Sequence, residues 1–277
     1  MGGLLQLARP VNCAMSAVGV LIGGVVAVGS GAWGEHARSL AFAGFAALAF
    51  TAGGNALNDL YDRDTDRVNH PERPLPSGRL SVGSARAFAA AAFAIAVGLA
   101  AFVNVYCIVI VVLNAAFMLA YEARLKAAGL PGNLIISYLV GSLFLFAGAA
   151  VISTDPDPLF RATILAVLAS CTTLGREITK DIEDMAGDVD RKTLPQRVGA
   201  KAAGGVAAAA LVAGMVLSVV PWLYGILPLA YLAVVLPADI MFIYAALVSA
   251  ANPARSQRLT KYAMVVALVA FLAGGLL

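Results

Sequence analysis

Long runs of apolar residues alternate along this chain with shorter polar stretches. We mark nine runs, each close to the length of about 20 residues that a helix needs to cross the hydrocarbon core of a membrane. The pattern predicts an all-α integral membrane protein: a bundle of about nine transmembrane helices around one central cavity, forming a single transmembrane domain over residues 1–277. The runs cover residues 11–30, 38–57, 85–104, 105–122, 132–152, 160–177, 202–220, 224–249 and 259–277.

Two boundaries between these runs are short, so the count depends on them. Asn104 alone interrupts the third and fourth runs, and residues 221–225 separate the seventh from the eighth. One wrong boundary would change the count to eight or ten.

The composition agrees with a membrane protein and excludes a soluble one. Hydrophobic residues make up 61% of the chain and charged residues only 13%, with a mean hydropathy of +0.86. Ordinary globular chains are about a quarter charged, and a soluble fold of this size could not hide so much apolar surface. The first ten residues lack a cationic region followed by a short apolar core and a cleavage site, so we expect no cleaved signal peptide.

The cysteines and histidines give little support for a soft-metal or haem site. Cys13, Cys107 and Cys171 are scattered through apolar runs without a CxxC pair, which argues against structural zinc and a disulfide framework. His36 and His70 are isolated residues between runs.

The Lys and Arg residues are distributed unevenly between the two sides of the membrane. Of the 19 basic residues, only Arg38 and Arg161 fall on one side, which leaves 17 on the other. The positive-inside rule therefore predicts that the N-terminus and both acidic stretches described below are cytoplasmic, and that the C-terminus is outside.

The first acidic stretch covers residues 58–79 and reads NDLYDRDTDRVNHPERPLPSGR. If the preceding helix continues, Asn58, Asp62 and Asp66 recur every four residues and share one helical face. Asp59 and Asp64 lie between them. Carboxylates crowded together beside a bilayer repel one another unless positive charge lies among them. A divalent metal ion would supply that charge.

The second acidic stretch covers residues 176–197 and follows another apolar run. Asp181, Asp184 and Asp188 are spaced i, i+3, i+7, again on one helical face, and both stretches continue into a basic residue and a Leu-Pro pair. A single charged run is usually a solvated loop. Because the helical spacing occurs twice, we interpret the stretches as a weak internal repeat: two acidic helix ends that face one site.

This set of residue types favours a magnesium–diphosphate site. Oxygen ligands without His or Cys suit Mg²⁺ or Ca²⁺, and Mg²⁺ typically binds through one or two carboxylates together with substrate phosphates. Basic neighbours can bind phosphate oxygens. Charge that develops on a departing diphosphate would be neutralised there, and an allylic cation would be kept from water inside the bundle. The basic neighbours are Arg63, Arg67, Arg73, Arg79, Lys180 and Arg191.

At these residues the chain resembles the UbiA superfamily of intramembrane prenyltransferases. Its first motif, NDxxDxxxD, is met at residues 58–66 and is followed by RPLPSG at residues 73–78; its second acidic motif is similar to KDIEDMAGD at residues 180–188. The resemblance covers nearly the whole chain. It implies that the acids bind Mg²⁺ and a prenyl diphosphate. The metal-binding candidates are Asp59, Asp62, Asp66, Asp181, Asp184 and Asp188, of which Asp62, Asp66, Asp181 and Asp184 are the catalytic candidates.

Several further residues are candidates for binding substrate. Tyr121, Arg124 and Lys126 close the fourth run, where they either anchor the helix at the interface or contact diphosphate or an anionic acceptor. Tyr138 lies inside the fifth run and could bond substrate or another helix. The complete set of substrate-binding candidates is Asn58, Arg67, Arg73, Tyr121, Arg124, Lys126, Tyr138, Lys180 and Arg191.

Three other polar residues have two interpretations each or lie at the edge of the site. Asp239 lies inside the eighth run, where an acid is a functional candidate by default, yet it follows Pro237 and could cap a break in the helix. Arg9 and Asn12 lie at the start of the first run, from where they could reach the same cavity.

Within the superfamily the chain is most similar to the digeranylgeranylglyceryl phosphate synthases of archaeal ether-lipid assembly. The segments that carry this similarity are KDIEDxxGD, KTLP at residues 192–195 and residues 132–148; Ala186 departs from relatives that often carry Glu there. The similarity implies transfer of geranylgeranyl from its diphosphate to the hydroxyl of geranylgeranylglyceryl phosphate. Its partners would be a prenyl diphosphate, a lipid-like acceptor and membrane lipid, with no nucleic acid.

Three alternative functions stay open at this point. The same mechanism could prenylate an aromatic acceptor such as 4-hydroxybenzoate. A CDP-alcohol phosphatidyltransferase also has acidic motifs, but neither stretch has the residue order that it requires. A cation-coupled transporter normally places its acids near the midplane, whereas all but Asp239 here lie at the ends of runs.

Overall fold

The computed structural model describes residues 2–29, 31–152, 157–185, 187 and 192–277. Within these ranges the secondary structure is helical and contains no strand. The described part of the chain has nine helices that are long and apolar enough to cross a membrane. The predicted all-α bundle is confirmed, and the chain is a multi-pass membrane protein.

The membrane-spanning segments follow the predicted apolar runs closely. They are α2 (Pro10–Val28), α3 (Ala37–Tyr61), α5 (Val82–Ala101), α6 (Val105–Ala120) continuing into the π-helix η1 (Tyr121–Leu125), α7 (Leu130–Ala150), α8 (Asp157–Asp184), α10 (Ala200–Leu217) continuing towards α11 (Val220–Leu223), α12 (Leu229–Val248) and α13 (Pro253–Leu276). Short helices occur at α1 (Gly2–Ala8), α4 (Arg63–Asn69) and α9 (Leu194–Val198).

Both uncertain boundaries separate helices in the structure. Asn104 caps α6: its side-chain oxygen accepts a hydrogen bond from the Cys107 amide (2.9 Å), and its Nδ2 donates to the Ala149 carbonyl oxygen (2.7 Å). One residue is enough to separate the two helices, because its side chain accepts a hydrogen bond from an amide that the first turn of α6 leaves unpaired. We expected the eighth run to begin at residue 224. In the structure helix α12 begins at Leu229, with Pro228 at its N-cap.

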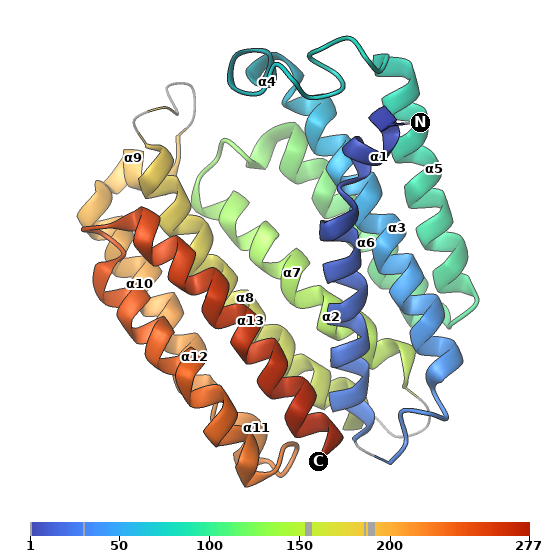
Figure 1. Cartoon of the computed structure of the whole chain (residues 1–277), viewed down its shortest axis with the longest axis vertical. Coiled ribbons are helices and arrows are strands. Elements are labelled where there is room, and N and C mark those ends of the chain that lie inside the picture. The colour runs from blue at the N-terminus through green and yellow to red at the C-terminus, as the bar shows by residue number, and fades with distance from the viewer. Residues whose placement is uncertain (1, 30, 153–156, 186, 188–191) are drawn as a thin grey trace.

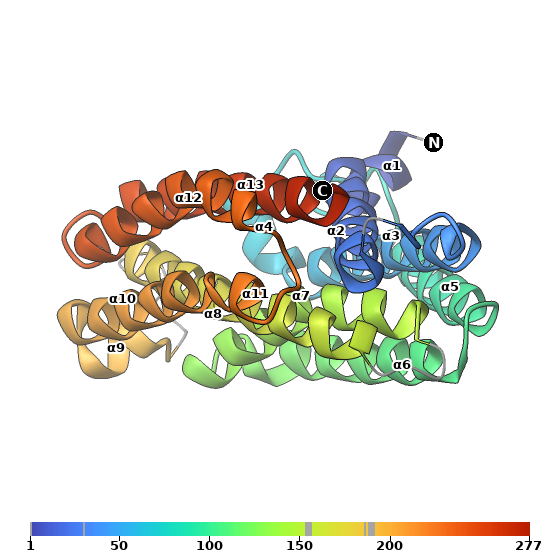
Figure 2. The ribbon, with the colours of Figure 1, turned by 90° about the horizontal axis from the view of Figure 1, so that it is seen from below.

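The long helices stand side by side around the middle of the molecule (Figure 1). Consecutive long helices pack against each other, and α13 contacts α2, which closes the arrangement into a ring. Viewed along the bundle, α12 and α13 lie on the side opposite α6 and α7 (Figure 2). This arrangement brings α3 and α8, the helices that carry the two acidic stretches, towards the same interior.

Small residues allow the helices near α8 to approach closely. A Cβ atom added to Gly141 of α7 would lie 2.5 Å from the Ala166 carbonyl oxygen of α8. A Cβ atom added to Gly175 of α8 would lie 2.8 Å from the Ala207 carbonyl oxygen of α10. Close backbone approach of this kind is how helices gain packing energy in lipid. It holds α8 in a defined position between its neighbours.

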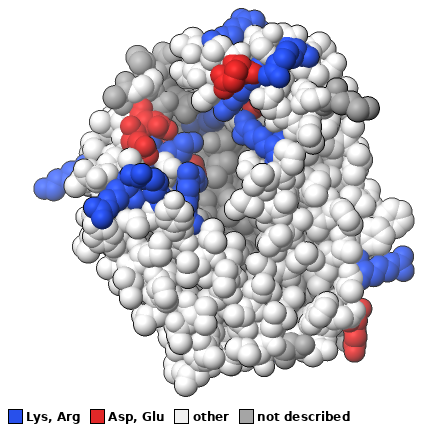
Figure 3. Space-filling view, in the orientation of Figure 1, with Lys and Arg blue, Asp and Glu red and all other residues white. Residues whose placement is uncertain are grey.

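Charged side chains gather at one end of the bundle, around a hollow in the surface (Figure 3). Helix α4 and the N-terminus lie at this same end (Figure 1). Helix α8 has 28 residues, so it is about 42 Å long and exceeds a hydrocarbon core of about 30 Å. Its last turns, which carry the second acidic stretch, therefore extend to the membrane surface.

Candidate active site

The hollow at the charged end is a cavity of about 670 Å³ that both acidic stretches line. Its walls come from the junction of α1 and α2, from α3, α4 and the loop after α4, from η1 with the residue after it, and from the end of α8 with Gly187. The predicted meeting of two acidic helix ends at one site is therefore what the structure shows. The lining residues are Arg9, Asn58, Asp62, Thr65, Asp66, Asn69, His70, Arg73, Tyr121, Lys126, Lys180, Glu183, Asp184 and Gly187.

The first acidic stretch keeps its helical periodicity through a bend. Helix α3 ends at Tyr61 and α4 begins at Arg63, with Asp62 between them. The Asp62 amide still donates to the Asn58 carbonyl oxygen (2.9 Å), and the Asp66 amide to the Asp62 carbonyl oxygen (2.7 Å). Because this bonding continues from residue i to residue i−4, Asn58, Asp62 and Asp66 all line the cavity, as their spacing predicts.

Asp59 occupies a different environment. Its side chain is only 4% exposed, and it is not among the described residues that line the cavity. It forms an ion pair with Arg9 and lies 3.7 Å from Nη1 of Arg73, which also forms a 2.7 Å ion pair with Asp66. Asp59 thus holds two of the basic side chains at the cavity wall.

Arg9 reaches the site through an unusual backbone. Its φ is 52°, and among the described residues it is the only one other than glycine with a positive φ. It lies between the end of α1 and Pro10, which starts α2. A left-handed conformation costs a residue with a side chain about 1 kcal/mol or more. Here it turns the chain so that the guanidinium meets Asp59 and lines the cavity.

A π-helical turn, η1, forms another part of the cavity wall. The Lys126 amide donates to the Tyr121 carbonyl oxygen (2.8 Å), a bond from i+5 to i. This wider turn brings Tyr121 and Lys126 to the same cavity. The Lys126 ammonium lies 2.6 Å from Oδ2 of Asp62 and 3.1 Å from Oε2 of Glu122. Nδ2 of Asn58 donates to the other oxygen of Glu122 (2.9 Å).

The second acidic stretch contributes the end of α8. Lys180, Glu183 and Asp184 line the cavity. Asp181 is not among the described lining residues; it accepts a 2.9 Å hydrogen bond from Nδ2 of Asn133 at the start of α7. Helix α8 ends at Asp184, so Asp181 and Asp184 both belong to its last turn. Asp188 and Arg191 lie outside the described residues.

Three predicted substrate-binding residues lie elsewhere in the structure. The Arg67 side chain is 59% exposed and forms a 3.1 Å ion pair with Asp64. Arg124 is exposed on the outer side of η1. Tyr138 packs edge-on against Phe117, between α7 and α6. None of the three is among the described residues that line the cavity.

Two further cavities are lined by different kinds of residues. An apolar cavity of about 230 Å³ lies among α2, α7, α8, α10, α12 and α13; Asp239 lines it, and its Oδ2 accepts a hydrogen bond from Ser218 (2.9 Å). Asn12 is exposed and lines neither this cavity nor the larger one, as far as the described residues show.

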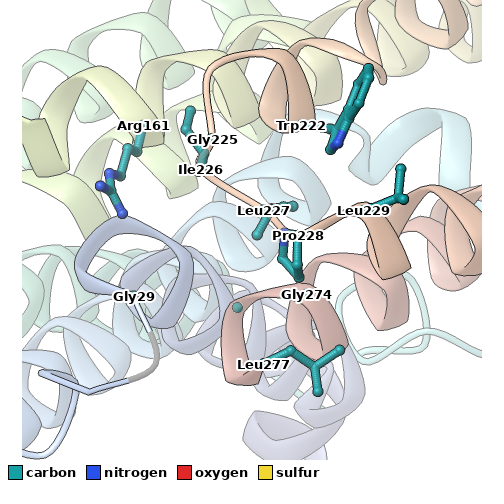
Figure 4. Close-up of a pocket in the computed structure, with 11 residues that line it drawn as sticks. Gly29, Arg161, Trp222, Gly225, Ile226, Leu227, Pro228, Leu229, Gly274 and Leu277 are labelled. Atoms are coloured by element: carbon teal, nitrogen blue, oxygen red, sulfur yellow. The ribbon is translucent and has the colours of Figure 1, made fainter.

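A cavity of about 500 Å³ lies at the end of the bundle where α2 and α13 finish. There the Arg161 guanidinium points towards Gly29 at the end of α2 (Figure 4). Its Nε also bonds Asp157 (2.6 Å). The guanidinium thus lies close to the C-terminus of α2, an end of a helix that carries partial negative charge. Of the three cavities described here, the 670 Å³ cavity is the one that acids from both stretches line, so we assign the chemistry there.

The donor set of the large cavity suits magnesium. No three His, Cys, Asp or Glu side chains in the described part of the chain are arranged to enclose a metal ion by themselves. Mg²⁺ does not need such an enclosure, because it usually takes one or two carboxylates and fills its other positions with water and phosphate oxygens. Asp62, Asp66 and Asp184 present carboxylates to the cavity. These donors fit a magnesium ion that binds together with a phosphate group.

The sequence reasoning missed several residues of the site. Glu122 ends the fourth apolar run and gave no signal beyond its spacing of four from Lys126. His70 continues the four-residue spacing of Asp62 and Asp66, and it lines the cavity with Nδ1 3.6 Å from a Glu72 oxygen. Thr65, Asn69 and Glu183 were also missed.

Comparison with known proteins identifies the family. The model of the UbiA prenyltransferase family matches residues 16–273. The chain belongs to this family. Digeranylgeranylglyceryl phosphate synthase of Methanopyrus kandleri is 43% identical over 278 residues, covering 99% of each chain. The enzyme of the same name from Halobacterium salinarum is 41% identical, covering 99% of this chain and 97% of the relative.

Solved structures of UbiA proteins have the same fold. One, described as digeranylgeranylglyceryl phosphate synthase in membranes, has a TM-score of 0.83 and 32% identity, covering 99% of this chain and 98% of that one. A UbiA homolog from Archaeoglobus fulgidus bound to GPP and Mg²⁺ has a TM-score of 0.65 and 17% identity, with coverage of 99% and 98%. At that identity the second comparison shows a common fold alone.

Proposed function

We propose that this chain transfers a geranylgeranyl group from geranylgeranyl diphosphate to the free hydroxyl of geranylgeranylglyceryl phosphate, with Mg²⁺ as cofactor. The observation that carries the proposal is the 670 Å³ cavity, where carboxylates and basic side chains from two distant stretches meet at one end of an apolar bundle. The relatives named digeranylgeranylglyceryl phosphate synthase, similar over almost their whole length, support the choice of acceptor.

Acids and bases of the site neutralise one another in pairs. Lys126 pairs with Asp62, Arg73 with Asp66, and Arg9 with Asp59. Mg²⁺ held by Asp62, Asp66 and Asp184 would supply positive charge that stabilises the departing diphosphate. Lys126 and Arg73 would then be available to bind phosphate oxygens, because the metal would replace them as the positive partners of these carboxylates.

The proposed reaction makes an ether and releases diphosphate. The bond between C1 of the prenyl chain and the diphosphate oxygen breaks, and the diphosphate leaves with the electron pair. The acceptor hydroxyl oxygen then bonds to C1 of the allylic cation, and the hydroxyl proton passes to the released diphosphate. Lys126, Arg73, Arg9 and Lys180 would stabilise the charge on the leaving group, since all four line the cavity.

The apolar interior would hold the prenyl chain and keep water from the cation. The 230 Å³ cavity among the helices is lined mainly by apolar side chains, including Phe144, Leu168, Phe242 and Phe271. A dry environment of this kind protects a reactive cation from hydrolysis. We place Asp59 and Asp181 behind the site, where they hold Arg9 and Asn133 in position.

Orientation and domain organisation complete the proposal. The excess of 17 basic residues over 2 supports a cytoplasmic cavity and N-terminus and an outer C-terminus. The apolar segments from α2 to α13 act as one transmembrane domain built around the site.

The decisive experiment compares acceptors side by side. Purified protein in lipid nanodiscs receives radiolabelled geranylgeranyl diphosphate, Mg²⁺ and either geranylgeranylglyceryl phosphate or 4-hydroxybenzoate. We expect label to enter only the glycerol phosphate lipid and to require Mg²⁺. Labelling of the aromatic acid alone would overturn the acceptor assignment, and release of no diphosphate with either acceptor would overturn the prenyltransferase assignment.

A further inference from the structure

Glu122 is a buried carboxylate that lies behind the cavity rather than in its wall. Its side chain is 1% exposed, and it is not among the described residues that line the cavity. An ionised carboxylate is rarely buried unless partners compensate it, because removal from water is costly. Both of its oxygens have such partners, and both partners are residues of the site: Asn58 and Lys126.

The hydrogen bond to Asn58 determines which atom of that amide faces the cavity. Nδ2 of Asn58 donates to Oε1 of Glu122 at 2.9 Å. A carboxylate accepts hydrogen bonds and cannot donate one, so it selects the NH₂ branch of the amide. The carbonyl branch of Asn58 is thereby left for the cavity that this residue lines. An amide oxygen is a ligand that hard cations accept, whereas an amide NH₂ group is not.

The contact with Lys126 gives that ammonium a second anionic partner. Lys126 lies 2.6 Å from Asp62 and 3.1 Å from Glu122. Asp62 is a proposed metal ligand, so it must release Lys126 when it binds a cation. Glu122 is not in the cavity wall and can keep its contact. The ammonium then stays anchored beside the site while its remaining N–H groups turn to phosphate oxygens.

The π-helical turn η1 places Glu122 in this position. The bond from the Lys126 amide to the Tyr121 carbonyl oxygen widens the turn that contains Glu122. π-Helical turns are rare and are found frequently at functional sites. In this turn Tyr121 and Lys126 reach the cavity, and Glu122 points to Asn58 of α3. The π-helical turn and the two contacts of Glu122 thus position residues of the same wall of the site.

We propose that Glu122 is a positioning residue that orients Asn58 and Lys126 for binding of the magnesium–diphosphate group. This inference rests on the proposed function for the identity of the substrate, but the contacts that carry it are those of the protein alone. Glu122 does not touch the reacting atoms. Its loss should therefore weaken binding of the metal and diphosphate more than it slows the chemical step.

The test uses Glu122→Gln, which keeps the size of the side chain, and Glu122→Ala, which removes both contacts. The matched control is Glu177→Gln, since Glu177 is also partly buried and paired with a base, Arg176, at the same end of the bundle. Two measurements are made. One is the dependence of turnover on geranylgeranyl diphosphate and Mg²⁺. The other is the thermal stabilisation of the protein by inorganic pyrophosphate in the presence of Mg²⁺, which involves no turnover.

For both Glu122 variants we expect a rise of about 10- to 100-fold in the concentrations of geranylgeranyl diphosphate and Mg²⁺ at half-maximal rate, the range typical of residues that orient ligands of a metal site. The pyrophosphate midpoint should rise by a similar factor, and kcat should fall less. Glu177→Gln should leave all four quantities unchanged. In a Lys126→Met background, Glu122→Gln should cause a smaller further loss than in the wild type, because only the contact with Asn58 is then left to remove.

The outcomes separate this inference from the proposed function. Unchanged midpoints in both variants, or a loss of folded protein in both without a change in ligand binding, would make Glu122 a structural residue and overturn the inference. If wild-type protein transfers no prenyl group but the variants shift the pyrophosphate midpoint, the inference holds and the proposed reaction is wrong.

Discussion

Asp62 and Asp64 offer a sharp test of the site, because they are two positions apart and differ in what they face. Asp62 lines the cavity, and its carboxylate is 2.6 Å from the Lys126 ammonium. Asp64 is 76% exposed and pairs with Arg67 and Arg63 at 3.1 and 3.4 Å. Replacing each with Asn removes one negative charge and keeps the shape of the side chain, so the two variants differ only in location.

The magnitude expected at Asp62 follows from its charge and position. At an effective dielectric constant of about 20, unit charges 2.6 Å apart attract by about 6 kcal/mol before desolvation is subtracted. Asp62→Asn removes this charge from the place where Mg²⁺ is proposed to bind. We expect kcat/KM to fall by on the order of 10³, equivalent to about 4 kcal/mol of transition-state stabilisation. The fold should survive, because Glu122 continues to compensate Lys126.

Asp64→Asn should have almost no effect. Exposed ion pairs contribute about 0–1 kcal/mol to stability, and Asp64 does not line the cavity within the described structure. We therefore expect turnover within about twofold of wild type.

The assay follows radiolabelled geranylgeranyl diphosphate into lipid product over a range of Mg²⁺ concentrations, with the melting temperature of each variant measured in parallel. The reasoning would be refuted if both variants lost activity equally, or if Asp62→Asn kept full activity at every Mg²⁺ concentration.

Two further predictions concern packing and orientation. Gly141→Ala should destabilise the bundle by about 1–3 kcal/mol, because the new Cβ would lie 2.5 Å from the Ala166 carbonyl oxygen, whereas Gly205→Ala meets no atom within 4 Å and should be neutral; thermal unfolding of the detergent-solubilised variants measures both. A membrane-impermeant thiol reagent added to intact cells should label Trp33→Cys and should miss Asp64→Cys, and the reverse pattern would contradict the orientation drawn from the basic residues.

The helices could be predicted from the sequence because the signal for each is local. A run of about 20 apolar residues must form a helix in lipid, since an unpaired backbone group there is too costly. Even the least marked boundary, between α5 and α6, is set by one residue, Asn104, whose side chain caps α6. The approximate place of the site was also local information, because the acids recur with helical spacing at the ends of two runs.

The partners of those acids could not be predicted, because they come from distant parts of the chain. Spacing groups Asn58, Asp62 and Asp66 on one face, but it does not say what that face meets. Glu122 is 64 residues away from Asn58 along the chain, and Arg9 is 50 residues away from Asp59.

Spacing also gave no reason to separate Asp59 from Asp62, or Asp181 from Asp184, as buried supports and cavity-lining acids. That distinction depends on how α3, α8 and η1 are rotated about their own axes. The rotation is determined by packing against neighbouring helices, including the close approach of α7 to α8 at Gly141. The sequence by itself therefore determined which segments cross the membrane and which ends are acidic. The tertiary structure decided which carboxylates face the cavity, because only packed helices define an interior.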